Sequence, residues 1–89
     1  MKAKSGFILR NVVDEFILMP TGDNIGKFKG TVLLNEVSAF IWEKLQSPVS
    51  KDELLKEVLD QFEVENPAAE ADLDELLKKF KEYDIIGDD

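Results

Sequence analysis

Six carboxylates gather in the C-terminal half of this 89-residue chain, and they are the first feature that could support chemistry. Clustered carboxylates can bind a cation or exchange protons, but the twelve-residue spacing of a calcium-binding loop is absent. Asp74 and Glu75 instead precede Lys78 and Lys79 by four residues, as ion pairs do on the exposed surface of a helix. We therefore predict a solvated helix surface and no metal site. The six residues are Glu63, Glu65, Glu70, Asp72, Asp74 and Glu75.

Other catalytic groups are scarce, because the chain contains neither histidine nor cysteine. Histidine is the usual proton donor and acceptor near neutral pH, and cysteine would supply a thiol nucleophile or a thiolate ligand. The serines Ser5, Ser38, Ser47 and Ser50 therefore have no imidazole to activate them. We expect a protein that binds rather than catalyses, with no cofactor and no metal of its own.

The segment GDNIGKF (Gly22–Phe28) is similar to the end of a phosphate-binding loop but does not fulfil its pattern. One residue is missing between the glycines, and Phe28 stands where a serine or threonine would bind Mg²⁺. The glycines, Asp and Asn of Thr21–Gly30 predict a loop or an irregular hairpin arm instead.

The net charge of −8 is distributed unevenly along the chain. Residues 1–34 hold five Lys/Arg against three Asp/Glu, whereas residues 35–89 hold six against sixteen. Phosphate backbones repel an acidic surface, so nucleic acid is excluded as a partner. No apolar run approaches the roughly 20 residues of a membrane helix, and no apolar signal region follows the N-terminal MKAKSG. We expect a cytoplasmic protein that contacts no membrane.

Two stretches near the N-terminus are rich in β-branched and aromatic residues and flank a polar centre. They predict antiparallel strands at Phe7–Val12 and Phe16–Met19, joined by a tight turn at Val13–Glu15. A third short apolar run, Val32–Leu34, predicts one further strand.

Three helices follow, each with its own start signal. Asn35 can cap the first helix, and Ser50 and Glu53 form a capping box for the second. Asn66 is the predicted cap of the third, with Pro67 at its first helical position. Apolar residues recur at helical spacing in all three, and two isoleucines follow them. These core candidates are Val37, Phe40, Ile41 and Leu45, then Leu54, Leu55, Val58, Leu59 and Phe62, then Ala69, Leu73, Leu76, Leu77 and Phe80, with Ile85 and Ile86 at the end.

Three strands followed by three helices predict an α+β domain with an antiparallel sheet, in a winged helix-turn-helix-like arrangement. We expect one domain over residues 1–89, with flexible tails at 1–5 and 88–89. Trp42 falls off the apolar line of its helix, and we interpret it as a core aromatic at the boundary with the surface.

A sheet this small cannot close on itself, so it must have edges. If Thr31–Leu34 lies at an edge, its unpaired N–H and C=O groups can accept an extended peptide as an additional strand. The alternative is that the glycine-rich arm covers this edge.

The segment LNEVSAFIWEKL (Leu34–Leu45) resembles the PqqD-like family, small proteins related to the pyrroloquinoline quinone biosynthesis protein D. The resemblance extends over nearly the whole chain, from Gly6 to Gly87. Asp72 and the following leucine also fall where the third helix of the family has an aspartate before an aliphatic residue. Two positions depart from the pattern: Ser38 replaces a common glycine, and Asp84 stands where a glycine usually ends the helix.

This resemblance implies a winged-helix-like fold and a non-enzymatic peptide chaperone, also called a precursor-peptide recognition element. Such a protein binds the leader of a ribosomally made precursor peptide and presents it to a radical S-adenosylmethionine (SAM) enzyme or another peptide-modifying enzyme. The leader is expected to add beside the third strand, in a groove against the third helix. Leu76 and Phe80 also fit the core pattern, so the face that each presents stays open. The implied peptide-binding residues are Thr31, Val32, Leu33, Leu34, Asp72, Leu76, Lys79, Phe80 and Tyr83.

Two other functions compete with this interpretation. A winged-helix transcription regulator would share the fold, but its recognition helix is normally basic, whereas the third helix here begins with Glu70, Asp72 and Asp74. A regulatory or structural subunit of a larger enzyme would bind through a helix face without contacting a peptide. The expected oligomeric state is a monomer, or a weak dimer formed by pairing of open strand edges.

Overall fold

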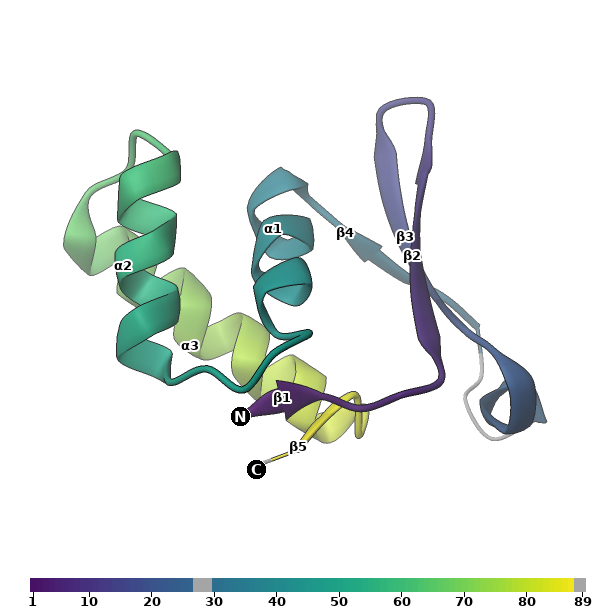
Figure 1. Ribbon diagram of the computed structural model, residues 1–89. Coiled ribbons are helices and arrows are strands. Elements are labelled where there is room, and N and C mark those ends of the chain that lie inside the picture. Colours follow the sequence, from purple (N-terminus) through teal and green to yellow (C-terminus); the bar gives the residue numbers. More distant parts are fainter. Residues whose placement is uncertain (27–29, 88–89) are drawn as a thin grey trace.

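The computed structural model describes residues 1–26 and 30–87, and three antiparallel strands precede three helices in it (Figure 1). This order confirms the predicted α+β fold. Residues 27–29, which belong to the predicted arm, lie outside the described residues. The main elements are β2 (Phe7–Val12), β3 (Glu15–Pro20), β4 (Val32–Leu34), α1 (Glu36–Lys44), α2 (Lys51–Gln61) and α3 (Asn66–Glu82), and the shorter ones are β1 (Lys2–Ala3), the 3₁₀ helix η1 (Gly22–Gly26) and β5 (Ile86–Gly87).

The three-stranded sheet has the order β2-β3-β4, and its two sides differ in burial. β3 is the central strand, with Ile17 opposite Leu33 and Leu18 opposite Val32. Side chains alternate between the two sides of a strand, so Leu18 and Val32 face the core while Leu33 faces outward. Figure 1 shows the β2–β3 hairpin extending away from the helices. The sheet therefore has an inner face on the core and an outer face in solvent.

A two-residue turn, Val13-Asp14, joins β2 to β3, because β3 begins at Glu15 rather than at Phe16. Val13 has a φ angle of 60° and is the only residue of this turn with a positive value. A positive φ at the first central position is typical of a type II′ turn, where glycine is preferred. A β-branched residue in this conformation is strained.

Two of the three predicted helix caps are confirmed. The Asn35 side chain accepts a hydrogen bond from the Ser38 amide at 2.7 Å. In the capping box of α2, the Ser50 and Glu53 side chains each accept a bond from the other residue's amide, both at 3.1 Å. These bonds satisfy backbone donors that have no partner inside the helix.

The predicted cap of α3 is wrong by one residue. Asn66 is already helical, and Glu65 occupies the cap position with extended backbone angles. The Glu65 carbonyl accepts the first intrahelical bond, from the Ala69 amide at 2.9 Å. Pro67 consequently stands at the second helical position, where its missing N–H still costs no helical bond.

Helix α3 ends in a left-handed residue, Asp84, with a φ angle of 59°. The Ile85 amide donates to the Phe80 carbonyl at 2.8 Å, and the Asp84 amide donates to Lys81 at 3.1 Å. This pair of bonds is a Schellman motif, usually closed by glycine. The Asp84 carboxylate also pairs with Lys4, so aspartate has a partner here that glycine lacks.

The segment 1–5, where we expect a flexible tail, includes the short strand β1. Strand β1 pairs antiparallel with β5, and Ala3 is buried. The Met1 amino group donates to the Val49 carbonyl at 2.8 Å, and the Val49 amide returns a bond to Met1. Figure 1 shows β1 and β5 together near the C-terminal end of α3. Residues 88–89, the other expected tail, lie outside the described residues.

One hydrophobic cluster holds the sheet to the helices. Leu45, Leu54, Phe80 and Ile85 are completely buried in it. Trp42, expected at the boundary with the surface, is also buried, and its indole N–H has no acceptor in the described part of the chain.

We predict that Val13→Gly raises the free energy of unfolding by about 1 kcal/mol, because glycine adopts a positive φ without strain. Val13 is 87% exposed, so little packing is lost. Asp14→Gly is the matched control, since Asp14 has no positive φ and glycine there only loosens the unfolded chain. The midpoint temperature of thermal unfolding should rise for Val13→Gly and should not rise for Asp14→Gly. A lower midpoint for Val13→Gly would contradict the turn assignment.

Candidate functional site

Strand β4 forms one edge of the sheet. Within residues 1–26 and 30–87 it pairs only with β3, so its other side carries no strand. Val32 and Leu34 are 5% and 7% exposed, whereas Leu33 between them is 63% exposed. Thr31 is exposed and precedes the strand. β2 is the other outer strand, but only β4 leads directly into a helix next to a pocket.

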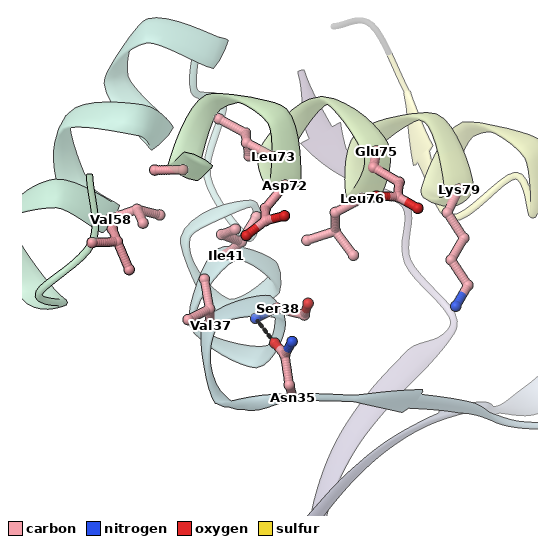
Figure 2. Close-up of a pocket in the computed structure, with 12 residues that line it drawn as sticks. Asn35, Val37, Ser38, Ile41, Val58, Asp72, Leu73, Glu75, Leu76 and Lys79 are labelled. Atoms are coloured by element: carbon pink, nitrogen blue, oxygen red, sulfur yellow. Dashed lines mark hydrogen bonds between the residues drawn. The ribbon is translucent and has the colours of Figure 1, made fainter. Parts of the chain in front are cut away.

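This pocket has a volume of about 290 Å³ and lies between the start of α1 and the middle of α3. Asn35, the residue after β4, forms part of its wall, so the strand ends at the pocket (Figure 2). Figure 2 also shows Leu76 pointing from α3 toward α1. The apolar wall is formed by Val37, Ile41, Val58, Val64, Ala69, Leu73 and Leu76, and the polar wall by Asn35, Ser38, Asp72, Glu75 and Lys79.

The structure brings three of the five implied α3 residues into the pocket: Asp72, Leu76 and Lys79. Phe80 does not line the pocket, and its side chain is 0% exposed in the core. Tyr83 is 42% exposed at the end of α3, outside the pocket, and the Lys79 amino group lies 5.9 Å from its ring centroid. The spacing of three or four residues along α3 places Asp72, Leu76, Lys79 and Tyr83 on one face.

Several pocket residues were not among those implied by the resemblance. Val37, Ser38 and Ile41 come from the first two turns of α1, at the three- and four-residue spacing of one helix face. Glu75, predicted to lie on a solvated surface with Lys79, is exposed and also lines the pocket. The helical spacing on α1 was visible in the sequence, but it could not show that this face lies opposite α3.

Salt bridges at the surface connect the three helices. Lys51 at the start of α2 pairs with Asp74 on α3, with Glu70 at 3.9 Å, and Lys44 on α1 pairs with Glu57 on α2 at 3.5 Å. The predicted pair of Asp74 with Lys78 is therefore replaced by a contact across helices. The hydrogen bond to Asp74 raises the pKa of Lys51 above its ordinary value of 10.5, against a smaller opposing effect of desolvation.

The described residues contain no group of three or more His, Cys, Asp or Glu side chains arranged to bind a metal ion. Over the same part of the chain, none of the helices has the length and apolar character needed to cross a membrane.

A raised lysine pKa stabilises the folded state fully below about pH 10.5, and this contribution is lost as the pH rises through the raised value. We therefore predict that the wild-type protein loses more stability between about pH 9 and pH 11.5 than Asp74→Asn does, measured as urea midpoints. Asp72→Asn is the control, because Asp72 forms no ion pair within the described chain. Equal losses for wild type and Asp74→Asn would show that this pair does not couple to folding.

Both the sequence and the fold of this chain match known proteins. A family model described as coenzyme PQQ synthesis protein D (PqqD) matches residues 15–86. The structure of TbiB1 in complex with the TbiA(beta) leader peptide is similar, with a TM-score of 0.74, 20% identity, and coverage of 99% of this chain and 100% of that one. Lasso peptide synthetase B1 complexed with the leader peptide gives a TM-score of 0.69 and 21% identity, with 91% and 89% covered. No curated protein sequence gives a significant match. The two structures share the fold, and the family match confirms the resemblance: the chain belongs to the PqqD family.

Proposed function

We propose that this protein binds the leader segment of a ribosomally made precursor peptide as an added strand along β4, and presents it to a modifying enzyme without catalysing a reaction itself. The observation that carries the proposal is the edge of β4, which pairs with no second strand among the described residues, beside a pocket lined by α1 and α3. Its N–H and C=O groups can continue the ladder of the sheet onto a peptide backbone.

The pocket suits peptide side chains better than a separate small molecule. Its volume of about 290 Å³ stands at the lower limit of typical ligand sites. An added strand would direct every second side chain toward α3. The apolar wall around Leu76 would select apolar side chains, and the charges of Asp72, Glu75 and Lys79 would fix orientation.

The relatives support the same function. TbiB1 and lasso peptide synthetase B1 have this fold and were solved with leader peptides bound. Membership of the PqqD family agrees with an accessory protein that acts on behalf of an enzyme. A radical SAM enzyme as the partner stays a prediction from the family resemblance, and the cytoplasm stays the predicted location.

Within the proposal, Val32–Leu34 supply the edge, and Asp72, Leu76 and Lys79 supply the opposite wall. Thr31 and Tyr83 would contact a peptide that extends beyond the pocket at either end. Phe80 is not included as a contact, because its side chain has no solvent-exposed surface that a peptide could contact. Its burial supports the groove from the core side.

Binding should be mapped by backbone NMR titration with candidate precursor peptides encoded near the gene. We expect shifts of the amides of Val32–Leu34 and of α3 from Asp72 to Tyr83, since these surround the proposed strand. A peptide of the same composition in scrambled order is the control. Shifts confined to α2 would favour an enzyme subunit that binds through a helix face, and absence of shifts with every candidate peptide would count against leader binding.

The pocket is tested separately by Leu76→Gln, which keeps the side-chain volume but removes the apolar contact. We expect about a tenfold weaker peptide affinity, since burial of a leucine stabilises by about 1.5 kcal/mol or more. Lys78→Gln is the matched control on the same helix, exposed and outside the pocket. Calorimetric titration should separate the two variants, and an equal affinity for both would remove Leu76 from the site.

A further inference from the structure

Leu33 is exposed in an unusual place. Its neighbours Val32 and Leu34 are buried on the inner face, so the alternation of the strand directs Leu33 to the outer face. Leucine exposed on an open edge strand invites unwanted pairing, and natural edges usually carry lysine or another charge instead. Here an exposed leucine lies on the edge beside the pocket.

Leu33 has an apolar cross-strand neighbour on the outer face. Its partner across the ladder is Ile17 on β3, and Ile17 in turn stands opposite Arg10 on β2. Strands are spaced about 4.8 Å apart, so Arg10 is two strands, roughly 10 Å, from β4. Glu15, the nearest carboxylate by register, is also on β3 and not on the edge. Among the residues that the structure describes, a side chain placed beside Leu33 by a new strand would therefore have leucine as its cross-strand neighbour.

A strand that adds to β4 presents side chains in two directions. One alternating set turns toward α3 and the pocket, as described above. The other set turns outward, and one of its members stands directly beside Leu33. Cross-strand neighbours at this distance interact, with aromatic and β-branched side chains favoured next to an aliphatic one.

We propose that Leu33 is a specificity-determining residue that selects an apolar side chain at the outward-facing peptide position beside it. This inference rests on the proposed function. The peptide is then read on both sides of its strand, by the pocket on one side and by Leu33 on the other. The recognised segment is a run of consecutive apolar residues, rather than an alternation of apolar and polar ones.

The test is a selection from a displayed library of random peptides, about twelve residues long, on the wild-type protein and on three variants. Leu33→Lys replaces the exposed leucine with a charge, and it should leave the fold intact because the side chain is already 63% exposed. Ile8→Lys is the matched control on the same outer face, and it lies on β2, the opposite edge of the sheet. Leu76→Gln identifies which peptide positions face the pocket.

The expected result is two alternating sets of apolar positions in the peptides that the wild type selects. Leu76→Gln should relax one set, and Leu33→Lys should change a position of the other set from apolar to acidic, by about fivefold or more in relative frequency. Ile8→Lys should leave both sets unchanged.

Two results would overturn the inference while binding of a peptide itself stands. In the first, the pocket-facing set is enriched but the outward set is random, or does not change in Leu33→Lys. In the second, the chaperone still selects peptides, but Ile8→Lys rather than Leu33→Lys changes their pattern, which would place the added strand on β2. A selection that enriches no peptides at all would instead remove the proposed function, and the role of Leu33 with it.

Discussion

The burial of Val32 and Leu34 on one side of β4 is the constraint on which the rest of this structure depends. Both side chains enter the core, so the strand can neither rotate about its axis nor shift by one residue without exposing them. This fixes the direction of the edge and the outward position of Leu33. Asn35 then caps α1 immediately after the strand, so no flexible linker separates the edge from the pocket. The joint between strand and helix is thus a rigid corner of the site.

The opposite wall is positioned by contacts at both ends of α3. In its first half, Asp74 and Glu70 form ion pairs with Lys51 of α2. At its end, the left-handed Asp84 reverses the chain so that Ile85 and Ile86 enter the core and β5 pairs with β1. Leu73, Leu77 and Phe80 fill the side between these ends. Because α3 is fixed over its whole length, the distance between its exposed face and β4 is set by the fold.

Much of this fold could be predicted from local signals. The β-branched and aromatic residues of Phe7–Val12, the cap at Asn35 and the Ser50–Glu53 box are all local signals, and each of the three predicted features is confirmed. The pairing of β1 with β5 could not be predicted, because a two-residue strand has no periodicity and its partner is more than 80 residues away. The partner of Asp74 was missed for the same reason: spacing along one helix cannot reveal a lysine on another.

The candidate site was predicted less completely than the fold. The resemblance implied Asp72, Leu76 and Lys79, which do meet at the pocket, together with Phe80, which is buried. A helical pattern that is apolar on one face does not show where the boundary of the core falls, so Leu76 and Phe80 were equivalent in the sequence. Their surroundings differ, because Phe80 is completely buried in the core whereas Leu76 lines the pocket next to α1.

The shortness of β4 has a consequence for kinetics. A three-residue edge offers only a few main-chain hydrogen bonds, each stabilising by about 0.5–1.5 kcal/mol in water. A complex held by so few bonds and one small pocket would have a dissociation constant on the order of micromolar, and at ordinary association rates the peptide would leave on the order of once per second. Such a residence time suits a carrier that must release its cargo after each round of modification, and a longer edge would hold the peptide after the enzyme had finished with it.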